Sequence, residues 1–280
     1  MRNETCVAFL RWALPRMGMR WEGFRKPRDQ VCKRIARRMA EIGLPSIEAY
    51  RARLESDSAE WEVLDSLCRV TISRFYRDRG VFDHLRDRAL PDLAGRVEAG
   101  STLRAWSAGC ASGEEPYSLR LVWDLALRDR FPGVELRIVA TDAEPEVLER
   151  ARRACYPRST LRDLPEGWVE AAFVCSDDPA TADPCCLRAP YARSVELRNE
   201  DVRETMPEGP FHLVLCRNLV FTYFREALQR RLLRGILERM LPASRLVIGA
   251  HEELPGDRWP LERAASGLPV FRRISGGLSG

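Results

Sequence analysis

The chain has 280 residues, 45 of them Lys or Arg and 41 Asp or Glu, which gives a formal net charge of +4 at pH 7. This length fits one large domain or two smaller ones, and a hydrophobic fraction of 45% is enough for a buried core. The sequence shows neither a long apolar run nor a secretory signal pattern, so we expect neither a membrane-spanning nor a secreted protein.

The nine cysteines are scattered and include no CxxC pair. This pattern is typical of reduced thiols, so we expect a cytoplasmic protein with neither a disulfide framework nor a zinc site. His84, His212 and His251 are too far apart in the sequence to suggest a metal cluster, and no metal cofactor is expected. His251 follows a buried strand and is a candidate for lining a site, whereas His212 is expected to be structural.

Residues 1–90 are predicted to form an N-terminal helical domain. A stripe of apolar residues at helical spacing runs through it, made up of Val31, Ile35, Met39 and Ile42. Gly43 is a typical helix end. Ser46 is predicted to cap the next helix, and Asp57 with Glu60 has the spacing of a capping box.

Basic residues outnumber acidic ones by ten to four between residues 20 and 53. One group lies on the helix face opposite the apolar stripe and consists of Lys33, Arg34, Arg37 and Arg38. A solvated face is the commoner explanation of such a group. The scarcity of compensating acids favours instead a docking surface for an acidic, helical protein. No nucleic-acid reading motif accompanies the group.

Residues 91–280 are predicted to form an α/β domain. Strands are predicted at 103–107, 134–141, 211–216, 245–250 and 270–274, and helices at 116–127, 145–154 and 225–241. This alternation favours a parallel, doubly wound sheet. Residues from about 156 to 199 break the rhythm and are predicted to be a small antiparallel insertion with strands at 173–175, 185–187 and 194–197.

The first predicted strand leads into a short loop of small residues that contains Gly109 and Gly113 and ends at Glu114 and Glu115. A strand, a glycine loop and a helix start form a cradle for a nucleotide-like ligand. The two acids disfavour a pyrophosphate and favour a ligand with hydroxyl groups and positive charge, such as S-adenosylmethionine (SAM). The alternatives are a tight turn that binds nothing and acids that complement the helix N-terminus.

Asp142 ends the second predicted strand, where an acid accepts hydrogen bonds from ribose hydroxyls in nucleotide-binding α/β folds. A helix cap is an equally common role for such an acid when it is taken alone, and the glycine loop favours the ribose. Arg217 and Asn218 follow the central strand, at the edge of the sheet where ligands bind, and Tyr223 lies just beyond them. The polar segment 71–77 is either a solvated linker or part of a site.

Five blocks, in order, resemble the CheR-type chemotaxis-receptor glutamate methyltransferases of bacteria. They are residues 71–78, 107–118, Ala140–Asp142, Cys216–Asn218 with the aromatic pair Tyr223–Phe224, and Gly249–Glu252. The resemblance covers about residues 22–275. It implies a SAM-dependent methyltransferase with a Rossmann-like doubly wound sheet, an N-terminal all-α domain and a small inserted β-subdomain.

The resemblance also implies the site residues. The predicted cofactor contacts are Thr71, Ser73, Arg77, Gly109, Glu114, Asp142, Asp201, Val202, Arg217 and Asn218. Arg77 and Tyr223 are the predicted catalytic residues. Thr71, Ser73 and the pair Asp201–Val202 depart from the family's usual residues. The stretch after Asn218 is one residue longer than usual, so Thr222 competes with Tyr223 for the tyrosine position.

The implied reaction transfers a methyl group from SAM to the side-chain carboxylate of a protein glutamate. A carboxylate is ionised at neutral pH and needs no general base. Two alternatives remain: a small-molecule or non-chemotaxis protein acceptor, and a regulatory module that binds SAM or its product without turnover. A nicotinamide oxidoreductase is disfavoured because the glycine spacing is not GxGxxG.

Overall fold

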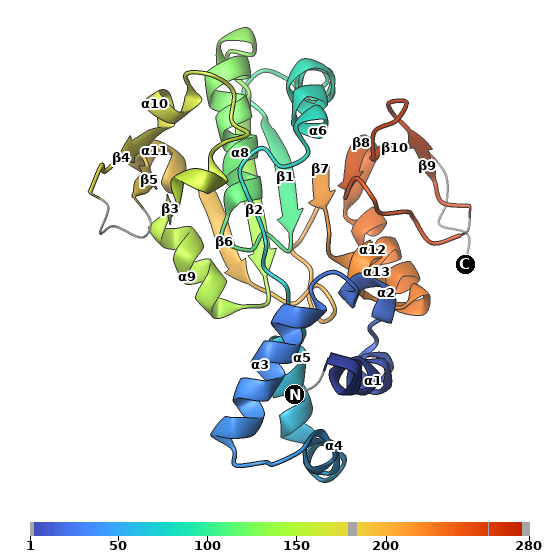
Figure 1. Ribbon diagram of the computed structural model, residues 1–280. Coiled ribbons are helices and arrows are strands. Elements are labelled where there is room, and N and C mark those ends of the chain that lie inside the picture. The colour runs from blue at the N-terminus through green and yellow to red at the C-terminus, as the bar shows by residue number, and fades with distance from the viewer. Residues whose placement is uncertain (1–2, 179–183, 257, 276–280) are drawn as a thin grey trace. The chain divides into compact units, whose positions relative to one another are not determined.

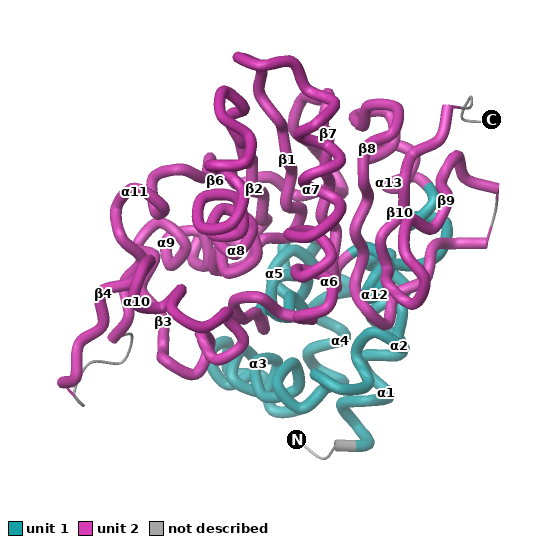
Figure 2. The backbone as a smooth tube through the Cα atoms, turned by 90° about the horizontal axis from the view of Figure 1, so that it is seen from above, with its two compact units in different colours: residues 1–71, 220–230 teal, residues 72–219, 231–280 magenta. Residues whose placement is uncertain are grey.

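The computed structural model describes residues 3–178, 184–256 and 258–275 (Figure 1). The chain divides into two compact units, Met1–Thr71 with Val220–Arg230 (unit 1) and Ile72–Leu219 with Arg231–Gly280 (unit 2), which Figure 2 shows in teal and magenta. The sequence places the boundary at residue 90 instead. The helices between residues 79 and 94 belong to unit 2 because Phe82, Leu85 and Leu90 are buried in its core.

Unit 1 is helical. Its helices are α1 (Asn3–Ala13), α2 (Trp21–Phe24), α3 (Arg28–Glu41), α4 (Ile47–Ser56), α5 (Ser58–Cys68), α12 (Val220–Tyr223) and the start of α13 (Glu226–Glu238), with the 3-10 turn η1 (Leu14–Met17). Val31, Ile35 and Met39 of the predicted apolar stripe are buried in α3, whereas Ile42 follows the helix and is partly exposed. The cap of α4 is confirmed, since the Ser46 hydroxyl accepts the N–H of Ala49 at 3.2 Å.

The predicted capping box at α5 is wrong in part. Asp57 caps the helix by accepting the N–H of Ala59 at 3.0 Å. Glu60 is buried instead, with its carboxylate 2.7 Å from Arg38 and hydrogen-bonded by the Tyr50 hydroxyl at 2.9 Å. The Arg38 guanidinium binds both oxygens of the Glu60 carboxylate, and such a bidentate pair is stronger than a single bond to a backbone N–H.

Unit 2 contains a seven-stranded sheet in the order β6-β2-β1-β7-β8-β10-β9. Its strands are β1 (Thr102–Ala108), β2 (Glu135–Asp142), β6 (Val195–Asn199), β7 (Phe211–Cys216), β8 (Met240–Ile248), β9 (Leu261–Arg263) and β10 (Val270–Arg273). The pairs from β6 to β8 are parallel, as predicted for β2, β1, β7 and β8 but not for β6. The last two pairings, β8 with β10 and β10 with β9, are antiparallel, so the sheet is mixed rather than wholly parallel.

The helices of unit 2 include α6 (Arg79–His84), α7 (Leu90–Ala94), α8 (Glu114–Val122), α9 (Pro145–Arg153), α10 (Trp168–Ala172) and α11 (Ala189–Ala192). Single π-type turns η2 (Leu85–Ala89) and η3 (Trp123–Leu127) continue α6 and α8, and 3-10 turns lie at η4 (Arg128–Arg130) and η5 (Arg158–Thr160). Both α8 and α9 pack on β2 and β6 and lie in front of the sheet in Figure 1. No helix among the described residues is both long and apolar enough for a membrane span.

The inserted region differs from its prediction. The strand expected at 194–197 is β6, which pairs with β2 in the main sheet. The small antiparallel sheet consists of β3 (Cys155–Tyr156), β5 (Cys185–Leu187) and β4 (Phe173–Cys175), in that order. A strand of two residues is too short to show the alternation of apolar and polar side chains by which strands are recognised in a sequence. The sequence therefore does not predict β3. Residues 179–183 of the expected insertion lie outside the described residues.

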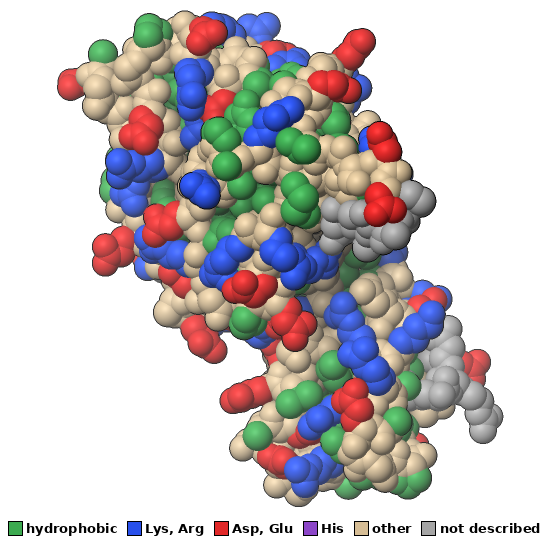
Figure 3. All heavy atoms as spheres, turned by 90° about the vertical axis from the view of Figure 1, so that its left-hand side faces the viewer, with side chains coloured by type: hydrophobic (Ala, Val, Ile, Leu, Met, Phe, Trp, Pro, Cys, Tyr) green, Lys and Arg blue, Asp and Glu red, His purple; other side chains and the backbone are tan. Residues whose placement is uncertain are grey.

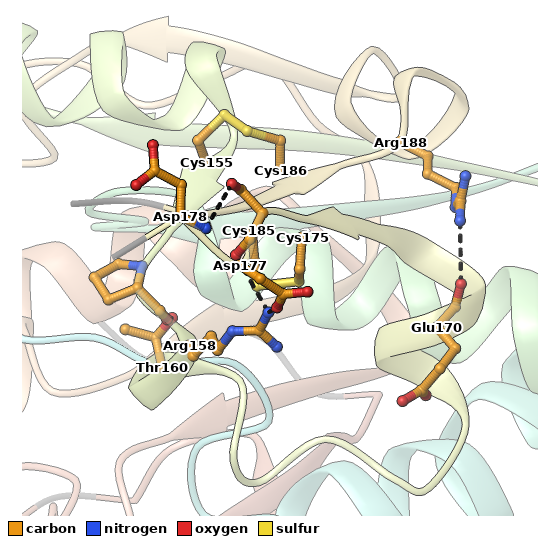
Figure 4. Close-up of a disulfide and its surroundings, with 12 residues drawn as sticks. Cys155, Arg158, Thr160, Glu170, Cys175, Asp177, Asp178, Cys185, Cys186 and Arg188 are labelled. Atoms are coloured by element: carbon orange, nitrogen blue, oxygen red, sulfur yellow. Dashed lines mark hydrogen bonds and ion pairs between the residues drawn. A yellow bond between two sulfur atoms is a disulfide. The ribbon is translucent and has the colours of Figure 1, made fainter. Parts of the chain in front are cut away.

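The expectation of reduced cysteines is wrong. Unit 1 contains the disulfide Cys6–Cys32, and the small sheet contains Cys155–Cys186 and Cys175–Cys185, drawn in Figure 4. Each bond in the sheet joins residues that lie directly opposite each other on neighbouring strands. Strand register therefore creates pairs that sequence spacing does not reveal. The disulfides also remove the cysteine-based argument for a cytoplasmic protein.

Candidate active site

The loop after β1 bends by means of left-handed residues. Gly109 and Gly113 have φ of +73° and +91°, and Ala111 has φ of +49°. A Cβ at Gly109 would lie 2.6 Å from a methyl carbon of Leu219, so both the backbone angle and the space require glycine there.

The first half of the loop is fastened to the end of β2. The N–H groups of Gly109 and Cys110 donate to the carbonyl of Thr141 at 2.8 and 3.0 Å. The Asp142 carboxylate accepts the N–H of Ala111 at 2.8 Å with Oδ2 and that of Glu144 at 3.0 Å with Oδ1. Asp142 thus holds the loop in place. Each carboxylate oxygen has two acceptor sites, so a bond to a backbone N–H does not by itself prevent a second bond to the same oxygen.

Glu114 begins α8, and its side chain is buried, with the residue 3% exposed. Ser73 lies near its carboxylate and lowers the pKa of Glu114, by less than burial raises it. Oε2 of Glu114 is also buried and has no hydrogen-bond partner among the described residues. Burial raises the pKa of Glu114 above its ordinary value. Leaving such an acceptor unpaired costs about 1–3 kcal/mol or more, so this atom is suited to a donor from a ligand.

Arg217, at the end of β7, forms a buried ion-pair network. Its guanidinium lies 3.0 Å from the Glu115 carboxylate and 2.7 Å from the Asp78 carboxylate. It also donates to the backbone carbonyl of Arg77 at 2.7 Å. The two acids of the loop therefore differ: Glu115 is paired inside the protein, whereas Glu114 keeps an unpaired oxygen.

The polar segment Ser73–Asp78 is attached to α8. The N–H of Tyr76 donates to the Ser118 hydroxyl at 2.8 Å, and that hydroxyl donates to the Glu114 carbonyl at 2.6 Å. The Arg77 guanidinium donates to the Ile72 carbonyl at 2.9 Å, and its side chain is partly exposed. The segment is therefore not a solvated linker.

A second carboxylate ties the ends of β7 and β8 together. Glu252, which is 9% exposed, accepts the N–H groups of Asn218 at 2.9 Å and Gly249 at 2.6 Å. Asn218 has a left-handed φ of +56°. A Cβ at Gly249 would lie 2.9 Å from Asn218 Oδ1, so the glycine allows this close approach.

Asp201 and Val202 follow β6. The Asp201 carboxylate pairs with Arg203 at 2.6 Å and accepts the N–H of Arg203 at 2.9 Å. Val202 is buried. The pair thus lies beyond the carboxyl end of β6, at the same edge of the sheet as Asp142 at the end of the neighbouring strand β2.

Two family models match the sequence. The one described as "CheR methyltransferase, SAM binding domain" matches residues 71–266, which is more than half of the chain. The one described as "CheR methyltransferase, all-alpha domain" matches residues 26–65. The chain belongs to the CheR methyltransferase family. It is a SAM-dependent methyltransferase with a Rossmann-like fold, as the motifs predict.

Curated relatives of this CheR-family chain agree with the assignment. It is 31% identical over 229 residues to the chemotaxis protein methyltransferase of Salmonella typhimurium, covering 80% of this chain and 76% of that one. A probable chemotaxis protein methyltransferase of Rhizobium etli is 28% identical, with 81% and 85% coverage. An uncharacterized 104.1 kDa protein of Rhodobacter capsulatus is 30% identical over 80% of this chain, which spans only 23% of its length.

The predicted site residues of this CheR-family chain fall in both units. Unit 2 contains Ser73, Arg77, Gly109, Glu114, Asp142, Asp201, Val202, Arg217 and Asn218, and unit 1 contains Thr71 and Tyr223. Within unit 2, Ser73 lies near Glu114, and Asp142 contacts the loop that leads to Glu114. The unpaired oxygen of Glu114 fits a cofactor such as SAM that carries hydroxyl and ammonium donors.

Tyr223 lies on α12, within unit 1. Its ring packs on Phe24 with centroids 5.1 Å apart. The neighbouring carbonyl of Thr222 accepts a hydrogen bond from Arg20 Nε at 3.0 Å. A Cβ at Gly23 would lie 2.4 Å from that carbonyl oxygen, so glycine permits α2 to approach α12. The choice between Thr222 and Tyr223 stays open, because both side chains are partly exposed.

The basic group on α3 separates into two pairs. Arg38 binds buried Glu60, and Arg34 donates to the carbonyls of Leu67 and Arg69 at 3.3 and 2.5 Å. The side chains of Lys33 and Arg37 are exposed. On the face shown in Figure 3, basic side chains lie among acidic ones, so positive charge is not continuous there.

Several residues that organise the site were not anticipated individually from the sequence. In the sequence, Asp78 and Glu252 are notable only as the last residues of two blocks that resemble the family. Their hydrogen-bond partners, Arg217 and Asn218, lie far from them in the chain. Among the histidines, Nδ1 of His212 accepts the N–H of Arg104 at 3.0 Å, which confirms a structural role. His251 is exposed.

Proposed function

We propose that this protein transfers the methyl group of SAM to the side-chain carboxylate of a glutamate in a chemoreceptor-like protein, forming a methyl ester. One observation carries the proposal: a buried carboxylate oxygen of Glu114 has no hydrogen-bond partner among the described residues. Glu114 follows the glycine loop directly and lies near Ser73, in a chain that belongs to the CheR family.

Cofactor binding is assigned to the edge of the sheet in unit 2. Glu114 and Asp142 supply acceptors for the hydroxyl and ammonium groups of SAM, and the glycine loop allows its backbone to approach closely. The remaining proposed contacts in unit 2 are Ser73, Arg77, Gly109, Asp201, Val202, Arg217 and Asn218. Thr71, in unit 1, is proposed separately on the family resemblance alone. When bound, SAM supplies an electrophilic methyl carbon attached to a positively charged sulfur.

The acceptor carboxylate is placed by Arg77. It is ionised at neutral pH, so the protein needs to orient it rather than deprotonate it, and orientation alone supplies several kcal/mol. Arg217 hydrogen-bonds the backbone carbonyl of Arg77, which fixes the start of that side chain. A single arginine orients the carboxylate without fully neutralising the attacking oxygen. Tyr223, in unit 1, is the second proposed catalytic residue.

The acceptor is proposed to be an acidic, helical protein that docks on α3. Lys33 and Arg37 are the exposed members of the basic group and supply the direct contacts. Arg34 and Arg38 act indirectly, because their guanidinium groups have partners inside unit 1.

The proposal is tested with the full-length protein, methyl-labelled SAM and a purified cytoplasmic fragment of a chemoreceptor. We expect label on the fragment that mild base releases as methanol, as an ester requires. Replacing both Lys33 and Arg37 by Glu should raise KM for the fragment without changing the Kd for SAM. Label that resists base, or no label on the fragment, would contradict the proposal.

A further inference from the structure

The second half of the glycine loop has an anchor that lies outside the predicted site. The Tyr156 hydroxyl, from β3, donates to the carbonyl of Ser112 at 2.7 Å. Ser112 is 2% exposed and lies two residues before Glu114. Asp142 and Thr141 bind the loop at Gly109 to Ala111, whereas the Tyr156 contact fixes the next residue, Ser112.

The ring of Tyr156 also supports the segment that carries Ser73 and Arg77. It packs edge-on against Phe75, with centroids 4.8 Å apart and an interplanar angle of 86°. Phe75 lies midway between Ser73 and Arg77, and its N–H donates to the carbonyl of Thr160 at 3.0 Å. Tyr156 therefore contacts both the loop that leads to Glu114 and the segment that carries Ser73 and Arg77.

The small sheet holds Tyr156 rigidly. The tyrosine is 1% exposed, pairs with Cys185 across the strands, and directly follows Cys155, which is bonded to Cys186. Burial raises the pKa of Tyr156 well above its ordinary value, so its hydroxyl remains a donor throughout the physiological range.

We propose that Tyr156 is a positioning residue of the SAM site, which sets the turn at Ser112 and thereby the place of the Glu114 carboxylate. This inference rests on the proposed function, since it takes Glu114 as a contact of SAM. Without the hydroxyl, the buried carbonyl of Ser112 loses its partner, and the turn before Glu114 relaxes or admits water. The cofactor then meets a site that must be reorganised on binding, which lowers its affinity.

The test compares two tyrosine-to-phenylalanine variants of the full-length protein. Tyr156→Phe removes the bond to the loop and keeps the ring against Phe75. Tyr117→Phe is the matched control, because the Tyr117 hydroxyl is equally buried and shares its one proton between the carbonyls of Ala151 and Ala192, at 3.0 and 3.2 Å, rather than binding a carbonyl of the loop. Its ring lies beside Gly113, and phenylalanine keeps that ring in place. The control loses one shared hydrogen bond, so its thermal stability should fall about as much.

Calorimetric titration with SAM then separates positioning from stability. We expect Tyr156→Phe to raise the Kd for SAM about five- to tenfold, the loss of one well-placed hydrogen bond. We expect less than a twofold change for Tyr117→Phe. The KM for SAM should follow the Kd, with kcat at saturating SAM within about twofold of the wild type.

Equal SAM affinities in the two variants would overturn the role of Tyr156. If Tyr156→Phe is too unstable to titrate, Tyr156→4-methylphenylalanine fills the same space without a donor and gives the same comparison. Failure of the wild-type protein to bind SAM at all would instead contradict the proposed function, so the two failures are distinguishable.

Discussion

Glu114→Gln is expected to stabilise the protein in the absence of SAM while weakening SAM binding. Glu114 is buried, and burial is the largest cause of its raised pKa, so the folded protein bears a cost for ionising it. Glutamine keeps one acceptor oxygen and removes the charge. A neutral amide costs less to bury than an ionised carboxylate, so we expect a gain of about 1 kcal/mol. In a chain of this size, that gain corresponds to a rise in Tm of about 2–4 °C.

The gain depends on pH in a defined direction. A carboxyl group whose pKa is higher in the folded state destabilises the fold once it ionises, and this cost is absent below the pKa of the unfolded chain, about 4.3. The difference in Tm between Glu114→Gln and the wild type should therefore be largest near pH 7–8 and vanish near pH 4. Thermal melts across this range without SAM measure it.

Glu115→Gln is the matched control. This neighbouring acid is paired with Arg217 at 3.0 Å, so its loss leaves part of a buried guanidinium unpaired and should lower the stability at pH 7. SAM titration completes the comparison: Glu114→Gln should raise the Kd at least tenfold. A Glu114→Gln protein that is less stable at pH 7 and binds SAM normally would refute the reasoning.

Three further outcomes are expected. Replacing Cys155 and Cys186 together by Ser should cost about 3 kcal/mol of unfolding free energy, since the bond closes a loop with a sequence separation of 31; unchanged denaturant midpoints under non-reducing conditions would contradict this. Arg77→Ala should abolish methyl transfer and raise the Kd for SAM only severalfold. Normal turnover in this variant would show that Arg77 does not place the acceptor carboxylate. Asp142→Ala should weaken SAM binding at least tenfold by calorimetry, because it removes a charged acceptor and loosens the loop; an unchanged Kd would exclude it from the site.

Local sequence patterns predicted the frame of the site well. The strand, loop and helix around Gly109 and Glu114 are set by residues close together in the chain, and the apolar stripe of α3 follows from helical periodicity alone. The family blocks added the order of the remaining parts. These features depend on short-range geometry, which a sequence expresses directly.

Features that depend on distant contacts were not predictable. Arg217 pairs with Asp78, 139 residues away in the chain. From the sequence, Arg217 was predicted only as a hydrogen-bond donor to a ligand. The cross-strand disulfides depend on the register of a sheet whose first strand has two residues. The assignment of residues 79–94 to the larger unit follows from burial in its core rather than from helical character, which both units share.

Tandem mass spectrometry of an acceptor protein tests the central claim most directly. A chemoreceptor fragment incubated with the full-length protein and SAM should carry a methyl group on the side chain of a glutamate, and the same fragment incubated with Arg77→Ala should carry none. A methyl group on a nitrogen atom, or an unmodified fragment despite measurable SAM binding by the wild-type protein, would contradict the account.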